Sequence, residues 1–140
     1  MSGNVILRVA TKVLCPNIFL FALYVQFHGD YGPGGGFQAG VIMGAGFILY
    51  ALVYGLDYTR RVLPPGVAST CMALGVLLFA SVGVVTLLGG GAYLDYSALA
   101  EDQHIGQHWG IFTVELGVFI TVFGTMVSIF YAVAGRKGRN

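Results

Sequence analysis

Charge is the scarcest property of this sequence. Only 9% of its 140 residues are Asp, Glu, Lys or Arg, whereas 56% are apolar. A soluble domain carries about 25% charged residues, so this chain could not cover a water-facing surface with ionised groups. A net charge of +1 also gives no basic field for binding nucleic acid. The composition therefore excludes a soluble globular enzyme and leaves a small integral membrane protein with room for one domain.

Cysteine is scarce as well, and the groupings that support metal or redox chemistry are missing. Cys15 and Cys71 form no CxxC pair, so we expect no disulfide framework. His104 and His108 have HxxxH spacing, but Gly106 lies between them and no HExxH motif occurs. The sequence also lacks a clustered nucleophile and base, which argues against a membrane enzyme. We expect no enzymatic activity, no metal and no cofactor.

Long uncharged runs predict the transmembrane helices. Residues 31–56 and 62–94 contain no charge, and residues 103–135 contain only Glu115. A helix needs about 20 apolar residues to cross about 30 Å of hydrocarbon. We therefore predict an all-α integral membrane protein whose residues 1–140 form a single transmembrane domain. The predicted spans are residues 6–27, 36–56, 66–89 and 109–134, with an outer loop at residues 90–108.

The basic residues predict the orientation of these spans. They precede the first span, separate the second from the third, or follow the fourth: Arg8, Lys12, Arg60, Arg61, Arg136, Lys137 and Arg139. In a four-helix model they all fall on one side of the membrane. The positive-inside rule makes that side cytoplasmic. We therefore expect both termini in the cytoplasm and the two loops without Lys or Arg outside.

Glycine is abundant, with 22 residues, and two sets recur at helical spacing. These are Gly36, Gly40 and Gly44 at every fourth residue, and Gly110, Gly117 and Gly124 at every seventh. Small residues let helix backbones approach closely in lipid. We predict that at least one of these faces docks against another polypeptide. Packing of both faces within this bundle is an equally good interpretation of the pattern.

Glu115 is the first candidate for function, because it lies inside the last predicted span. A charge at the centre of a membrane helix costs about 2.5–3.5 kcal/mol on insertion scales. Such a carboxylate is either protonated or held by a partner, and both states suit the movement of a proton or cation. At 1.5 Å per residue it lies only about 9 Å beyond Trp109, in the outer half of the span. A static helix-to-helix hydrogen bond is the alternative.

His108 lies seven residues before Glu115, which is two turns of a regular helix. Histidine titrates near neutral pH, so the pair could form a short proton-carrying line from the outer surface. The segment from His28 to Gly40 is the most unusual stretch, with Asp30 near its start. It is neither a phosphate-binding nor a dinucleotide-binding motif. Its backbone could line a hydrated path, or it could simply connect two helices tightly.

This segment, His-Gly-Asp-Tyr-Gly-Pro-Gly-Gly-Gly-Phe-Gln-Ala-Gly, resembles the signature of the MnhB/MrpB family. The last helix of that family contains a histidine followed by an acidic residue and Leu-Gly-Val. His108 and the string Val-Glu-Leu-Gly-Val around Glu115 resemble this pattern. One departure is Ala39, where many members have a second consecutive glycine. The resemblance covers essentially the whole chain. Its loop and packing motif falls on Pro33, Gly34, Gly35, Gly36, Phe37 and Gly40.

The resemblance implies a B subunit of an Mrp-type multisubunit monovalent cation/proton antiporter in a prokaryotic plasma membrane. Such a complex exports Na⁺ in exchange for H⁺ and combines large antiporter-like subunits with small hydrophobic ones. Spans two to four contain no lysine, and Glu115 is their only deep acid. We therefore expect an accessory subunit, not the main proton pump. The alternative is a self-contained homodimeric proton-coupled exporter.

The ion-path candidates are Glu115, His108, His28 and Asp30. Glu115, with His108 and the loop after His28, would shape an outward-facing polar portion of an ion path or the interface beside it.

Overall fold

The computed structural model describes residues 4–28, 35–95 and 101–136 of the chain, and none of these residues forms a strand. They form five helices: α1 (Val5–His28), α2 (Gly36–Tyr54), α3 (Leu56–Val62), α4 (Pro65–Leu88) and α5 (Gln103–Arg136). All but the short α3 are long and apolar enough to cross a membrane. The expected fold class, an all-α protein with four transmembrane helices, is therefore confirmed.

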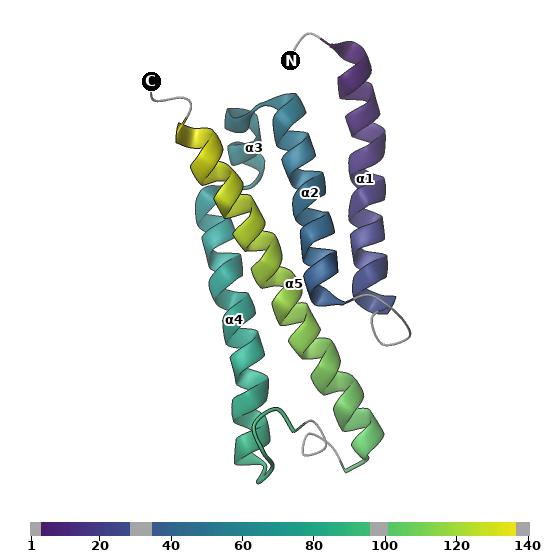
Figure 1. The fold of residues 1–140 in the computed structure, drawn as a ribbon, viewed down its shortest axis with the longest axis vertical. Coiled ribbons are helices and arrows are strands. Elements are labelled where there is room, and N and C mark those ends of the chain that lie inside the picture. Colours follow the sequence, from purple (N-terminus) through teal and green to yellow (C-terminus); the bar gives the residue numbers. More distant parts are fainter. Residues whose placement is uncertain (1–3, 29–34, 96–100, 137–140) are drawn as a thin grey trace.

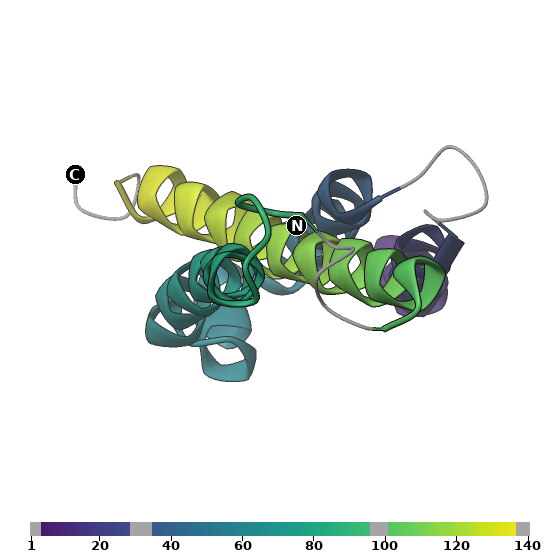
Figure 2. The ribbon, with the colours of Figure 1, turned by 90° about the horizontal axis from the view of Figure 1, so that it is seen from below.

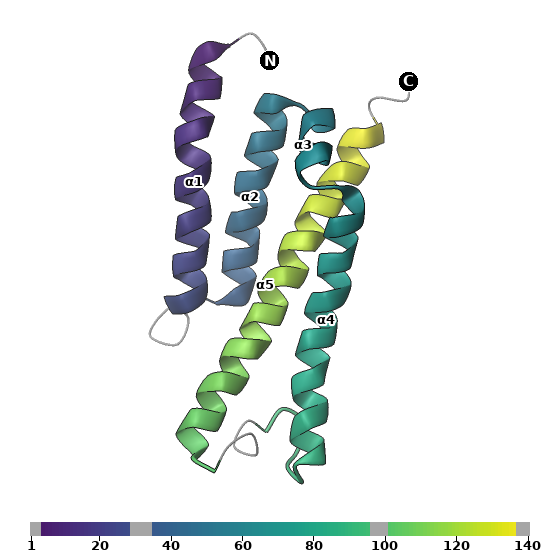
Figure 3. The same ribbon diagram turned by 180° about the vertical axis from the view of Figure 1, so that it is seen from behind.

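Helix α5 is the centre of the arrangement. It packs along α4 on one side and along α2 on the other, whereas α1 packs mainly against α2 (Figure 1). Seen end-on, α5 runs between α4 and α2 (Figure 2). The two ends of the chain lie at the same end of the bundle, here called the termini end, and α4 and α5 reach further than α1 and α2 at the opposite end (Figure 3).

The second expected span, residues 36–56, corresponds to α2, which ends at Tyr54, and Gly55 separates it from the short helix α3 that was not expected. Gly55 has φ of +98°, a left-handed conformation that glycine adopts without strain. Its amide donates to the Ala51 carbonyl at the end of α2, and its own carbonyl accepts from the Thr59 amide in α3. The chain therefore leaves the axis of α2 there, and the turn places α3 beside α5 at the termini end (Figure 1).

Helix α5 starts at Gln103, six residues before the expected start at residue 109. The outer connection is therefore shorter than the loop expected at residues 90–108. The Asp102 carboxylate accepts a hydrogen bond from the His104 backbone amide at 3.0 Å. This is an N-cap interaction, which satisfies an amide that the first helical turn leaves unpaired. The cap allows the helix to include Gly106.

Gly36, Gly40 and Gly44 of α2 contact α5, whereas Gly46 contacts α1. A Cβ placed on Gly40 would lie 2.8 Å from the Phe119 carbonyl oxygen, and one on Gly44 would lie 3.0 Å from the Met126 Cβ. Such distances are too short for real side chains, so glycine is what lets these two helices touch. The face formed by Gly36, Gly40 and Gly44 is thus used inside this chain.

Gly117 and Gly124 of α5 contact α4 in the same way. A Cβ on Gly117 would lie 2.9 Å from the Gly75 carbonyl oxygen, and one on Gly124 would lie 2.7 Å from the Ala68 carbonyl oxygen. Gly110 is also buried on this side of α5. The prediction that one glycine face would be left for another polypeptide is therefore wrong, because both faces serve packing within the bundle.

The termini end is closed by a core around Tyr131. Its hydroxyl donates to the Leu63 carbonyl at 2.7 Å, which ties α5 to the segment after α3. The Arg60 guanidinium lies over its ring, 5.6 Å from the ring centre. Partly buried apolar side chains surround this contact: Phe47, Leu56, Leu63, Phe123 and Phe130. The short α3 is therefore held against the bundle rather than projecting from it.

Candidate functional site

Helix α2 begins directly against Glu115. Gly36 is the first residue of α2, and a Cβ placed on it would overlap the Glu115 carbonyl oxygen. Gly35 precedes it with φ of +145°, and a Cβ there would lie 3.6 Å from Glu115 Oε1. Glycine at both positions therefore allows the start of α2 to contact the backbone and the carboxyl group of Glu115. The residue Glu115 is half-buried.

The electrostatics of this contact favour a negative charge. The first amides of a helix carry partial positive charge, and no side chain caps the start of α2. The half-buried carboxyl group of Glu115 lies beside that helix start. The position can therefore stabilise the ionised acid without a lysine or arginine. We call Gly35, Gly36 and Glu115, together with Gln26 described below, the outer junction, after the orientation that the basic residues predict.

Gln26 belongs to this junction and was missed by reasoning from the sequence alone. It is 2% exposed, and neither atom of its side-chain amide has a hydrogen-bond partner. It lies on the face of α1 that turns toward α2, because Cys15 on that face donates from its sulfur to the Gly46 carbonyl at 3.5 Å. The helices are antiparallel, so Gln26, eleven residues after Cys15, lies opposite Gly35, eleven residues before Gly46.

A second contact places Gln26 at the level of α5 near Glu115. The neighbouring Phe27 stacks on Phe112 of α5, with ring centres 5.8 Å apart. A buried amide without a partner costs about 1–3 kcal/mol, and an ordered water or ion commonly accounts for such a group. The spacing of the buried α1 residues Thr11, Cys15, Ala22 and Gln26 is the sequence signal that could have identified it.

The remaining predicted residues are more dispersed. His28 ends α1 half-buried, with its ring stacked on Tyr24 at 5.1 Å. His108 is exposed and meets the Trp109 ring edge-on at 6.1 Å. It shares the continuous helix α5 with Glu115, about 10.5 Å away along the axis. That separation requires water between the two groups for any proton transfer.

The rest of the predicted loop motif is only partly visible. Asp30, Pro33 and Gly34 lie outside the described residues. Phe37 is exposed on the first turn of α2, and Gly40 belongs to the contact with α5. Within the described ranges, no three His, Cys, Asp or Glu side chains gather where a metal ion could bind.

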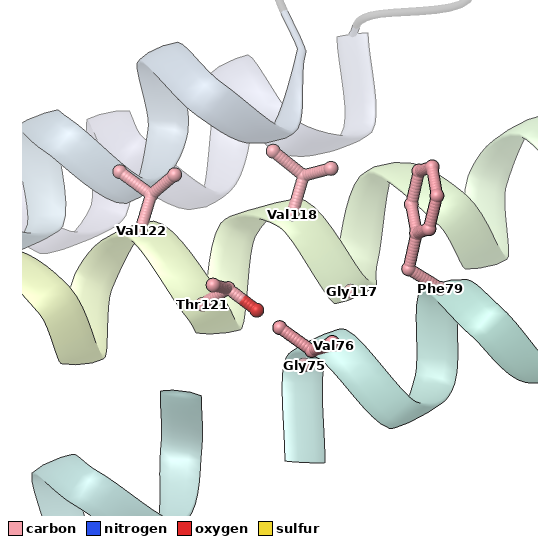
Figure 4. A pocket seen from close by; sticks show the side chains of 7 residues that line it. All are labelled: Gly75, Val76, Phe79, Gly117, Val118, Thr121 and Val122. Carbon is pink, nitrogen blue, oxygen red and sulfur yellow. The ribbon is translucent and has the colours of Figure 1, made fainter. Parts of the chain in front are cut away.

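A cavity of about 170 Å³ lies between α4 and α5, away from the outer junction (Figure 4). Thr121 is its one hydroxyl-bearing residue, and the hydroxyl donates to the Met72 carbonyl at 3.4 Å. The other lining residues are apolar or glycine. The cavity is therefore an apolar hollow beside the close contact of Gly75 with Gly117, and its lining side chains carry no charge that could hold a cation.

A family model described as "Domain related to MnhB subunit of Na+/H+ antiporter" matches residues 6–128. The chain belongs to the MnhB family. The relative mnhB2 of Staphylococcus haemolyticus (strain JCSC1435), named for an antiporter subunit, is 33% identical over 138 residues, which are 96% of this chain and 97% of the relative. The protein of the same name in Staphylococcus aureus (strain Newman) is 30% identical over the same shares.

Membership of the MnhB family confirms the resemblance seen in the sequence. Together with four candidate membrane-spanning helices, it makes the chain a multi-pass plasma-membrane protein. The family description names a subunit of a transporter rather than an enzyme. Within the matched residues, the outer junction combines an acid that can carry a proton or bind a cation with a neutral amide whose oxygen can ligate one.

Proposed function

We propose that this MnhB-family chain is an accessory subunit of a multisubunit antiporter that exports Na⁺ from the cytoplasm in exchange for H⁺. The family description and the names of the staphylococcal relatives support this assignment. Its partners are then the other subunits, both large antiporter-like and small hydrophobic ones. The distribution of lysine and arginine supports an orientation with both termini in the cytoplasm.

The outer junction borders the outward-facing part of an ion path. The observation that carries this proposal is the position of the Glu115 carboxyl group beside Gly35 at the start of α2. The described acids at this end, Asp95, Glu101, Asp102 and Glu115, have no described lysine or arginine among them. The local field therefore attracts cations, and oxygen ligands suit a hard cation such as Na⁺.

An accessory role fits the rest of the chain. Helices α2, α4 and α5 contain no lysine, so they offer no chain of acid and base groups through the membrane. Moving one charge through 100 mV is worth about 2.3 kcal/mol, and the larger subunits would couple that energy to Na⁺ export. The chain would shape the external end of the route and help the complex to assemble.

Substitution of Glu115 tests the role of the junction. Glu115→Gln keeps the size of the side chain and removes its charge. We expect Na⁺-driven proton exchange in membrane vesicles that hold the whole complex to fall at least about tenfold, the effect of losing 1.4 kcal/mol of stabilisation. The matched control is Asp57→Asn, an exposed acid at the termini end, which should leave exchange unchanged.

Assembly of the complex must be verified for both variants by co-purification. Unchanged exchange in an assembled Glu115→Gln complex would make Glu115 a structural residue. Purification in mild detergent also separates the subunit assignment from the alternative exporter. A subunit travels with several larger membrane proteins, whereas a self-contained exporter is recovered alone as a homodimer.

A further inference from the structure

A basic groove opens on the membrane-facing side of the termini end. It has a volume of about 310 Å³ and is lined by Val5, Arg8, Val9, Lys12 and Tyr54. Four of these residues belong to the start of α1, and Tyr54 is the last residue of α2. The groove lies at the opposite end of the bundle from Glu115 (Figure 1).

Tyr54 holds Arg8 in place. The guanidinium carbon lies 5.3 Å from the centre of the Tyr54 ring, which is a cation–π contact. The Tyr54 hydroxyl also donates to the backbone carbonyl of Arg8 at 3.1 Å. Because the ring occupies only one face of the guanidinium, the N–H groups along its edge stay available to an anion.

Lys12 lies one helical turn further along α1, about 6 Å from Arg8 along the axis. It is exposed, and it lies within the membrane-spanning stretch of α1. Among the described residues, no carboxylate pairs with Arg8 or Lys12. A cation at this depth is costly unless it reaches the interface or meets an anion, so Arg8 and Lys12 need a counter-charge that the described residues do not provide.

The surroundings indicate which anion that is. Three tyrosine rings contact one another beside the groove, those of Tyr50, Tyr54 and Tyr58, and the first two are stacked. Such aromatic clusters mark the level of the lipid headgroups. The termini end also carries five described basic residues against one acid, Asp57: they are Arg8, Lys12, Arg60, Arg61 and Arg136. The field there is positive, and it complements an anionic headgroup.

We propose that this groove binds the phosphate of an anionic phospholipid. Arg8 and Lys12 both contact the phosphate, whose oxygens can bridge two cations one turn apart. The acyl chains continue over Val9 and the exposed Val13. Arg60 cannot serve in the same way, because Tyr131 covers it and accepts a hydrogen bond from its Nη2. This inference stands apart from the ion path and holds whichever ion the complex moves.

Native mass spectrometry of the purified full-length chain in detergent can test the site. The probes are phosphatidylglycerol, which is anionic, and phosphatidylcholine, which carries no net charge. We expect phosphatidylglycerol to bind about tenfold more tightly than phosphatidylcholine. Each of Arg8→Gln and Lys12→Gln should weaken it about fivefold, and the double variant about 25-fold, following about 1 kcal/mol per basic residue.

The matched control is Arg61→Gln, an exposed basic residue at the same end whose loss should change nothing. The charge-conserving variants Arg8→Lys and Lys12→Arg should retain binding, which separates loss of charge from loss of folding. Helical content by circular dichroism verifies that each variant folds.

Three results would overturn the proposal. Equal binding of the two lipids by the unaltered chain would show that charge does not select the ligand. Displacement of phosphatidylglycerol by millimolar inorganic phosphate would assign the groove to a free phosphate. Unchanged lipid binding in the double variant, with loss of co-purifying subunits, would assign Arg8 and Lys12 to a protein interface.

Discussion

The two ends of the bundle differ in whether their polar side chains are hydrogen-bonded. At the termini end, Tyr131 donates to the Leu63 carbonyl and Tyr54 donates to the Arg8 carbonyl, so hydroxyl groups join elements that are distant in sequence. At the outer junction, Gln26 is as deeply buried but neither atom of its amide is paired. Polar groups join the helices at the first end, whereas the second holds a buried amide to which no described residue is hydrogen-bonded.

The difference follows from where the helices stop. Helix α2 begins at the level of Glu115, while α4 and α5 extend beyond the ends of α1 and α2 (Figure 3). Gly35 and Gly36 permit that abrupt contact, because Gly35 has φ of +145° and a Cβ on Gly36 would overlap the Glu115 carbonyl oxygen. Each end can be altered by a single substitution, and the expected effects differ in kind.

The largest effect is expected from Gly36→Ala. The added Cβ would overlap the Glu115 carbonyl oxygen, and a backbone atom cannot move without shifting the whole of α2 from α5. Overpacking of this kind costs about 1–3 kcal/mol, and more where backbone must move. We expect at least about 3 kcal/mol, measured as loss of thermal stability in detergent and of abundance in the membrane.

Gly66→Ala is the control for that substitution, because a Cβ on Gly66 meets nothing within 4 Å. It should leave stability unchanged or slightly raised, since alanine favours helix over glycine by about 1 kcal/mol. If both variants lost stability equally, close approach of α2 and α5 would not be the reason for Gly36.

Tyr131→Phe should weaken the termini end without touching ion exchange. The change leaves the Leu63 carbonyl without its 2.7 Å hydrogen bond inside a buried core, at a cost of about 1–3 kcal/mol. Thermal unfolding should report the loss, while exchange by the assembled complex stays normal. Tyr24→Phe, which alters an exposed ring near the opposite end, is the control and should change neither thermal stability nor exchange. A drop in exchange at full stability would show that the ends are coupled.

The smallest effect on stability is expected from Gln26→Leu, which should change stability and exchange in opposite directions. Leucine removes a buried amide that has no partner, so stability should rise by up to about 1 kcal/mol. Na⁺-driven exchange should fall nonetheless, because the junction loses an oxygen ligand. Gln107→Leu, at an exposed site on α5, is the control and should leave exchange intact. Lower stability together with normal exchange would contradict the role given to Gln26.

The four membrane spans and the position of Glu115 inside the last one could be predicted from the sequence, because both depend only on the composition of a continuous run of residues. It did not predict the short helix α3, because seven residues between two spans form no long apolar run and one glycine does not reveal the left-handed turn at Gly55. It could not choose a partner for the glycine faces, since small residues permit close approach without naming the opposite helix. The sequence did not identify Gln26 as a site residue, because a single polar residue near the end of a span is typical of the membrane interface.

The sequence by itself determined that this is a membrane protein, that it crosses the membrane as helices and that one acid lies within a span. The reason is that the free energy of moving a helix from water to lipid depends on the residues in that helix alone. Only the tertiary structure decided that α2 begins on Glu115 and that Gln26 is buried without a partner at that level. Those facts depend on how far each helix extends against its neighbours, which is settled by packing between segments distant in the sequence.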